Sequence, residues 1–288
     1  MMHPAGWVRG GFGHSTRCKS LRALVTGMLM LVALCAEAPA QTQHNRDVLY
    51  QVSTLDALLN GILDSVATVE DVLDRGGFGL GTFDAADGEM MVLDGIVYQA
   101  TVDGSINVMP PSAGTPFMAV THFVPDRMLD APGLEDFSAF SQWLEGQLPS
   151  RNIAYAVRVD GRFANIRYRS VARQQRPYPP LVEVTRQQAV FERKEVEGTL
   201  MGFWCPAFMN GVNVAGLHLH FLSADRGDGG HVLDLWLKQA KVGIDDTNGW
   251  DVQLPMVPAY LNADLGASNG SDLKSAEQGG TVPDASAH

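Results

Sequence analysis

Asp-Gly dipeptides recur between short segments of β-forming residues, and this pattern constrains the fold more than any other feature of the sequence. Asp-Gly suits the left-handed backbone of a two-residue turn, so two β-forming segments joined by it predict an antiparallel hairpin. The predicted hairpins are residues 90–101, around Asp94-Gly95, and residues 154–168, around Asp160-Gly161. A chain built from such units is expected to be dominated by mixed or antiparallel sheet.

Two segments carry a helical pattern instead. In residues 46–74, apolar residues recur every three or four positions, and Ser53 or Thr54 is placed to cap the start. Residues 134–148 form the second predicted helix. The fold class that we predict is α+β, with mixed or antiparallel β-sheets and a few flanking helices.

A polar, proline-rich segment at residues 173–180 (RQQRPYPP) predicts a linker. We expect it to separate two β-rich sub-domains, an N-terminal α+β one at residues 41–175 and a C-terminal one at residues 176–265. Residues 182–200 predict a strand soon after the linker. Residues 266–288 are rich in Ser, Gly, Asp and Ala and predict a partly loose tail.

The first forty residues have the composition of an export signal. Residues 1–22 carry four basic residues and no acid, and an uncharged apolar run of 14 residues follows at 23–36. The run is shorter than the roughly 20 residues that a helix needs to cross a bilayer, and a small-x-small site (APA, 38–40) follows it. We predict a signal peptide cleaved after Ala40 and a periplasmic or extracellular protein without a stable membrane span. The alternatives are an N-terminal membrane anchor, a wrongly assigned start, or lipoprotein attachment at Cys35.

Removal of residues 1–40 changes the net charge and the cysteine count, and with them the classes of protein that the composition excludes. The whole chain has a net charge of −11 and three cysteines, whereas residues 41–288 hold 17 basic and 31 acidic residues, a net charge of −14, and one cysteine, Cys205. A body this acidic, without a basic run, argues against binding nucleic acid through its phosphates. A single cysteine excludes an internal disulfide, so stability must come from the core and from any bound metal.

Three of the six histidines in residues 41–288 lie within fourteen residues: His218, His220 and His231. On a strand, side chains at positions i and i+2 point to the same face, so His218 and His220 are expected to project side by side. The glycine-rich loop at 224–230 can bring His231 back to them. Three neutral imidazoles leave a coordination position open, which is typical of catalytic zinc rather than of closed structural sites. We therefore predict a zinc site on the C-terminal sub-domain.

Two questions about these histidines stay open in the sequence. A symmetric hairpin centred on Gly227 would place His231 opposite Ser223, about 10 Å along the strand from His220. The loop must therefore be off-centre or bulged for the three side chains to converge. In the other interpretation, His218 and His220 are merely exposed or hydrogen-bonded histidines.

The segment 198–234, GTLMGFWCPAFMNGVNVAGLHLHFLSADRGDGGHVLD, resembles the α-acetolactate decarboxylase family. Four further segments resemble it in the same order: LYQVSTLDALLNG (49–61), GGFGLGTFDAADGEMMVLDGIVYQ (76–99), TPFMAVTHF (115–123) and YRSVARQQRPYPPLVEV (168–184). The resemblance implies a zinc-dependent enzyme that converts a small molecule, 2-acetolactate, to (R)-acetoin and carbon dioxide. It also suggests a homodimer.

The resemblance assigns roles to residues where the family's motifs match. The family's three metal-ligating histidines, its DGEM glutamate, its GTFDG threonine and its RSVP-like arginine map onto His218, His220, His231, Glu89, Thr82 and Arg169. Ala172 stands where the family has proline. A second functional glutamate lies in the family's C-terminal tail, which diverges here. Glu277 is the only glutamate from Gly198 to the C-terminus, so the role, if a glutamate retains it, falls to Glu277. We interpret His122 and Cys205 as structural.

The reaction explains these residue types. Loss of the carboxylate leaves two electrons that the neighbouring ketone accepts as an enediolate, and zinc bound to the hydroxyl and ketone oxygens would stabilise that charge. Arg169 can hold the carboxylate, and Glu89, Glu277 and Arg169 are candidates for the stereospecific proton donor.

Two other functions are kept as alternatives. The first is a zinc hydrolase or lyase acting on another small oxygenated acid. The second is a non-catalytic periplasmic zinc-binding module, which would need neither Arg169 nor Glu89.

Overall fold

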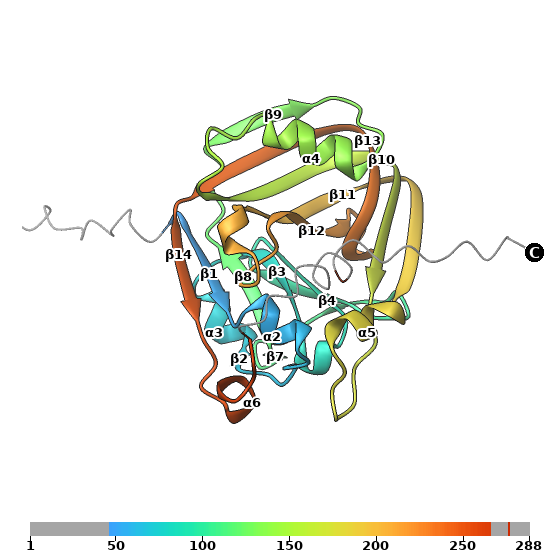
Figure 1. The fold of residues 1–288 in the computed structure, drawn as a ribbon. Helices are drawn as coiled ribbons and strands as arrows, with labels where there is room; N and C mark the ends of the chain where they lie inside the picture. The colour runs from blue at the N-terminus through green and yellow to red at the C-terminus, as the bar shows by residue number, and fades with distance from the viewer. Residues whose placement is uncertain (1–45, 266–275, 277–288) are drawn as a thin grey trace, which may run out of the picture. The chain divides into compact units, whose positions relative to one another are not determined.

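Two β-sheets, of seven and five strands, make up most of the protein in a computed structural model that describes residues 46–265 and Ala276 (Figure 1). The predicted signal peptide, and Glu277 in the tail, lie outside the described residues. The sheets are mostly antiparallel and the helices are few and short, so the predicted α+β class is confirmed.

The seven-stranded sheet has the order β14-β1-β8-β3-β4-β5-β6, and its neighbours are antiparallel except for the parallel pair β1–β14. Its strands are β1 (Val48–Val52), β3 (Phe78–Thr82), β4 (Glu89–Leu93), β5 (Ile96–Ala100), β6 (Ile106–Val108), β8 (Phe117–Thr121) and β14 (Gly249–Gln253). The predicted hairpin at Asp94-Gly95 joins β4 to β5, and both turn residues have the positive φ that such a turn requires. A two-stranded sheet, β2 (Ala67–Thr68) with β7 (Gly114–Thr115), lies apart from it in the pairing.

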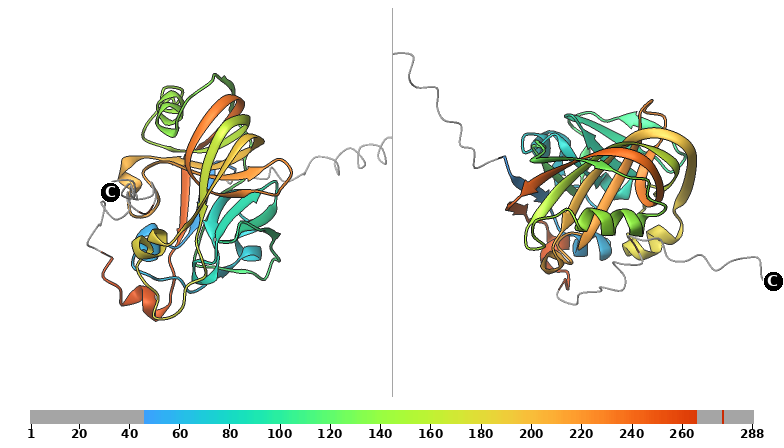
Figure 2. Two further views of the ribbon diagram at one scale, coloured as in Figure 1. Left: turned by 90° about the vertical axis from the view of Figure 1, so that its right-hand side faces the viewer. Right: turned by 90° about the horizontal axis from the view of Figure 1, so that it is seen from above.

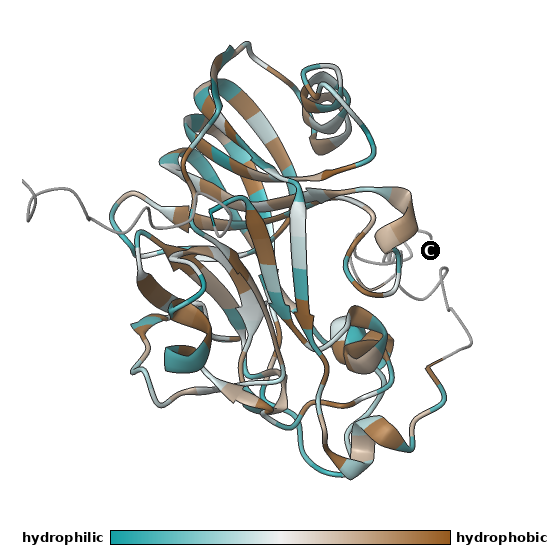
Figure 3. Ribbon diagram, turned by 90° about the vertical axis from the view of Figure 1, so that its left-hand side faces the viewer, coloured by the Kyte–Doolittle hydropathy of each residue, from teal (hydrophilic) through white to brown (hydrophobic). Residues whose placement is uncertain are grey.

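The five-stranded sheet has the order β10-β11-β12-β13-β9. Its strands are β9 (Arg127–Ala131), β10 (Ala154–Ser170), β11 (Ala189–Cys205), β12 (Gly216–Ser223) and β13 (Gly229–Thr247). Because β10 pairs with both β11 and β13, the strands β10 to β13 form a closed circuit of paired strands, and Figure 2 shows how strongly the long strands curve. In Figure 3 these strands alternate between hydrophilic and hydrophobic residues, as expected for a sheet with one buried face.

The predicted hairpin at Asp160-Gly161 is wrong, because β10 runs straight through this dipeptide. Neither residue has a positive φ, and Asp160 pairs with Thr199 on one side and Lys241 on the other. A Cβ atom on Gly161 would lie 2.7 Å from the Cβ of Ala240. The glycine therefore permits close approach of β13 and does not form a turn.

The continuous helix predicted for residues 46–74 is also wrong. The segment begins with β1, and Ser53, with φ of 66°, turns the chain before the short helix that Thr54 caps. Residues 48–52 form a strand because β8 and β14 pair with them on both sides, and this pairing overrides the helical spacing. The strand predicted for residues 182–200 starts later than expected, since residues 181–186 are helical and β11 begins at Ala189.

The helices are α2 (Leu55–Leu59), α3 (Val69–Leu73), α4 (Phe137–Glu145), α5 (Leu181–Arg186) and α6 (Pro258–Leu261), with 3₁₀ turns at Asp84–Ala86 and Ala207–Met209. Asp136 caps α4, whose buried Phe140 and Leu144 pack on the five-stranded sheet. Among residues 46–265, no helix is long and apolar enough to cross a membrane.

The two sheets pack against each other through one hydrophobic core. Met91 and Phe117 of the seven-stranded sheet share this core with Met201, Phe203 and Leu222 of the other sheet, and all five are almost fully buried. The predicted boundary at residue 175 does not coincide with the division between the sheets, because β9 and β10 precede it and β14 follows it.

The proline-rich segment at 173–180 is tied to the first sheet's loops. The backbone N–H of Gln174 donates to the carbonyl of Ala85 (2.8 Å), and Arg173 forms an ion pair with Asp84. Its composition is that of a linker, but these contacts fix it beside the loop that joins β3 to β4.

The connection from β8 to β9 leads from one sheet to the other and depends on a buried carboxyl group. An oxygen of Asp245 on β13 accepts from the backbone N–H of Val124 (3.2 Å), and the side chain is 1% exposed. Burial, with the charges of Asp126 and Asp47, raises the pKa of Asp245 to about 7. Because this pKa lies above that of the unfolded chain, the folded state loses stability as the pH rises from about 4 towards 7.

We expect Asp245→Asn to remove this loss, because the amide oxygen can still accept from Val124 and carries no charge. The variant should be more stable than the wild type at pH 8, on the order of 2 kcal/mol, with little difference at pH 4. Urea unfolding at both pH values measures this. Asp130→Asn, on the surface of β9, is the control; a gain at pH 8 no larger than that of the control would show that Asp245 carries no such penalty.

Candidate active site

His220 and His231 lie directly opposite one another across β12 and β13. Ser223 N donates to Asp228 O (2.8 Å), so the hairpin is centred between Asp225 and Arg226 and not on Gly227. This is the off-centre loop that convergence of the three histidines requires. Side chains directly opposite on an antiparallel pair point to the same face, so His231 lies beside both His220 and His218.

Hydrogen bonds within the loop set its length. The hydroxyl oxygen of Ser223 accepts from the backbone N–H groups of Gly227 (3.1 Å) and Asp228 (2.9 Å), and Asp225 Oδ1 also accepts from Gly227 (3.0 Å). Arg226 adopts the left-handed conformation, with φ of 62°. Ser and Asp side chains favour such local bonds to the backbone, and here they close a short turn that fixes the register of the strands.

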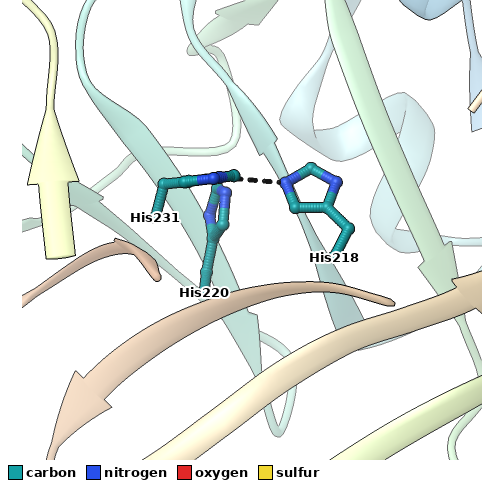
Figure 4. Close-up of side chains that lie close together, drawn as sticks. All are labelled: His218, His220 and His231. Carbon is teal, nitrogen blue, oxygen red and sulfur yellow. Dashed lines mark hydrogen bonds between the residues drawn. The ribbon is translucent and has the colours of Figure 1, made fainter. Parts of the chain in front are cut away.

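The three imidazoles converge on one small volume (Figure 4). All three are buried, their ligand atoms lie within 4.8 Å of one another, and Nε2 of His218 is 3.1 Å from Nδ1 of His231. Two nitrogens bound to one tetrahedral zinc ion lie about 3.3 Å apart, given Zn–N distances near 2.0–2.1 Å. The donor set and its spacing therefore fit a divalent metal ion, and this group could bind one.

The protonation states also suit metal binding. Burial, together with the positive charge of Arg169, lowers the pKa of His218 to about 3. Burial and the neighbouring His218 hold the pKa of His220 well below its usual value. Nδ1 of His220 donates to the carbonyl of Met90 (2.7 Å), which leaves the lone pair on Nε2. The rings of His218 and His220 are thus neutral at neutral pH, as metal ligands must be.

The seven-stranded sheet supplies the opposite side of the site. Thr82 and Glu89 lie directly opposite one another on β3 and β4, and both are buried. Glu89 Oε2 is 3.7 Å from Nε2 of His220, and Glu89 Oε1 is 3.8 Å from Nε of Arg169. Arg169, on β10, pairs with His231 in register. A single carboxylate therefore lies between the histidine group and a buried guanidinium.

The loop between Thr82 and Glu89 is strained. Ala85 and Ala86 have φ of 61° and 53°, a conformation that costs a residue with a Cβ about 1–2 kcal/mol. Gly88 N donates to the carbonyl of Val171 (3.1 Å), which lies two residues beyond Arg169 in the sequence. The hydroxyl of Thr82 donates to Gly88 O (2.7 Å). These bonds hold the ends of the loop at the site.

One cavity is lined by all the described residues that the sequence assigned to the site. Its polar end holds Thr82, Glu89, Arg169, His218, His220 and His231. Its remaining wall is apolar apart from Gly81 and Thr185: Leu55, Leu58, Leu63, Ala86, Phe117, Val171 and Leu181. No motif in the sequence marks these wall residues as part of the site, although most of them lie in segments that carry the family resemblance.

Two further predictions concern residues away from this cavity. His122 is exposed, and Cys205 is buried in the core, where burial raises the pKa of its thiol to about 12. Neither side chain lines the cavity.

The model of the alpha-acetolactate decarboxylase family matches residues 49–267. The alpha-acetolactate decarboxylase of Methanosarcina mazei is 42% identical over 83% of this chain and 83% of its own length. That of Methylococcus capsulatus is 43% identical over 81% of this chain and 90% of its own length. The crystal structure of alpha-acetolactate decarboxylase from Bacillus subtilis strain 168 matches with a TM-score of 0.78 and 35% identity, covering 80% of this chain and 99% of that one. The sequence motifs, the fold and these matches agree over most of the chain, which belongs to the alpha-acetolactate decarboxylase family.

Proposed function

We propose that this protein decarboxylates 2-acetolactate to (R)-acetoin and carbon dioxide with a zinc ion bound by His218, His220 and His231. Membership of the family makes the chain a carboxy-lyase. The observation that carries the zinc-dependent mechanism is the convergence of three buried histidines beside the Glu89–Arg169 pair in one cavity.

The histidine group would hold zinc without reducing its charge, because three neutral imidazoles add none. When bound, zinc supplies a Lewis acid that stabilises negative charge developing on the hydroxyl and ketone oxygens of the substrate. His220 is oriented for this role by its hydrogen bond to Met90, so the seven-stranded sheet fixes a ligand that belongs to the other sheet.

Arg169 is placed to bind the anionic end of the substrate. Its side chain is 4% exposed, and its guanidinium lines the same cavity as the histidines. A buried guanidinium makes strong, charge-assisted hydrogen bonds to a carboxylate or to a developing oxyanion. Such a local positive charge is needed because residues 41–288 are strongly acidic as a whole.

Glu89 is placed to move a proton. Its carboxylate lies within 4 Å of both His220 and Arg169, so it can reach a molecule bound between the histidine group and the guanidinium. Thr82 completes this side of the site. Its hydroxyl donates to Gly88 O, which leaves the oxygen able to accept a hydrogen bond from a bound molecule.

The purified protein should form acetoin from racemic 2-acetolactate, lose this activity with a zinc chelator and regain it with added zinc. His218→Ala should contain no zinc and form no acetoin above the uncatalysed rate, because two histidines remain where three are needed. His122→Ala, which changes an exposed histidine, is the control and should match the wild type. A metal-free His218→Ala protein with full activity would contradict the proposed mechanism.

We also propose that Glu277 supplies a second carboxylate to the site. Support comes from Ala276, which is fully buried and belongs to the same hydrophobic cluster as the cavity residues Leu55, Leu58 and Leu181. Glu277→Gln should lower turnover on the order of a hundredfold, the range for loss of a general acid or base, while zinc content stays unchanged. Asp284→Asn, in the same tail, is the control. Equal turnover in both variants would show that Glu277 has no part in the reaction.

We further propose that the chain is exported with cleavage after Ala40, on the basis of the basic, apolar and small-residue order of its first forty residues. Intact mass measurement of the protein recovered from the periplasm or medium of an expressing bacterium should give a chain beginning at Gln41. An uncleaved chain recovered with the membranes would contradict this proposal. We also propose that the protein forms a homodimer, as the family resemblance suggests. The molar mass of the purified protein in solution tests this.

A further inference from the structure

The guanidinium of Arg169 lies within ion-pair distance of Glu89, but its described hydrogen bond goes to a neutral partner. Nη1 donates to Oε1 of Gln188 (3.2 Å), whereas Nε lies 3.8 Å from the nearer oxygen of Glu89, beyond hydrogen-bonding distance. Burial makes the orientation of such a side chain depend on its protein contacts, because water can satisfy few of its five donors. Among the described residues, Gln188 is thus the one whose hydrogen bond directs Arg169.

Gln188 is itself fixed by its position in the chain. It follows α5, and its backbone N–H donates to the carbonyl of Thr185 (3.3 Å). The next residue, Ala189, begins β11 and pairs with Ser170, the neighbour of Arg169. Thr185 and Leu181 of α5 line the cavity. The segment 181–188 therefore forms part of the cavity wall and also supplies the hydrogen bond to the Arg169 guanidinium.

The neutrality of this partner matters for an anionic substrate. A carboxylate 3.2 Å from Nη1 would form a charge-assisted pair with Arg169 and would compete with the substrate's own carboxylate for the same charge. An amide oxygen accepts the hydrogen bond but carries no negative charge, so it does not pair with the positive charge of the guanidinium. Resting on the proposed function, we infer that Gln188 is a positioning residue that orients Arg169 for the carboxylate of the substrate without pairing its positive charge.

Gln188→Glu tests this inference directly, and Gln187→Glu is a matched control because it makes the same change at the adjacent, exposed residue. Two probes are titrated into the zinc-loaded proteins by calorimetry: 2-hydroxy-2-methylpropanoate, an unreactive anion, and acetoin, the neutral product. We expect Gln188→Glu to weaken binding of the anion on the order of tenfold or more and to leave acetoin binding unchanged. The KM for 2-acetolactate should rise by a similar factor with a smaller change in kcat, and Gln187→Glu should match the wild type.

Three results would overturn the inference: unchanged binding of the anion, equal weakening of both probes, or the same loss in the Gln187→Glu control. Equal weakening would show a structural role only. If Gln188→Glu does not fold, Gln188→Met replaces it; this variant lacks the acceptor, and it should weaken anion binding several-fold without affecting acetoin. Because the titrations need no turnover, a wild type that binds the anion but forms no acetoin from 2-acetolactate would refute the proposed reaction and not the role of Gln188.

Discussion

The pairing of His220 with His231 across β12 and β13 places the rest of the site. In the same register Arg169 of β10 pairs with His231, so that the guanidinium and the imidazoles gather at one end of the five-stranded sheet. A slip of one residue would turn His231 to the opposite face, because side chains alternate along a strand. The side-chain bonds of Ser223 and Asp225 within the loop exclude that slip. The hydrogen bonds of one short loop thus fix the strand register on which the buried site depends.

Packing of the seven-stranded sheet against this face determines the protonation, orientation and charge environment of the site. It buries the three histidines, which favours their neutral form, and it supplies the carbonyl of Met90 that orients His220. It also places Glu89 within 4 Å of both His220 and Arg169. Buried polar groups are costly unless they have partners, so each buried charge and polar atom of this site needs a hydrogen bond or an opposite charge. That requirement explains why both sheets contribute to one small cavity.

Much of this arrangement follows from the sequence. The Asp94-Gly95 turn, the α+β class and the convergence of His218, His220 and His231 rest on local patterns that the structure retains. The Asp160-Gly161 prediction failed because pairing with β11 and β13 on both sides determines the backbone there, and this pairing involves residues 37 to 81 positions away. The helical spacing in residues 46–74 was likewise overridden by pairing with β8 and β14. Gln188 could not be identified from its surroundings in the sequence, because its role depends on Arg169, which is 19 residues away and meets it only after β10 and β11 have paired.

We expect one metal ion between the two sheets, bound by three histidines of the five-stranded sheet. X-ray diffraction from crystals of the active enzyme, recorded on both sides of the zinc absorption edge, would locate this ion. One anomalous peak should lie within bonding distance, about 2.0–2.1 Å, of a ring nitrogen from each of His218, His220 and His231. An enzyme that forms acetoin from 2-acetolactate with no metal at these three nitrogens, or with its metal elsewhere, would contradict this expectation.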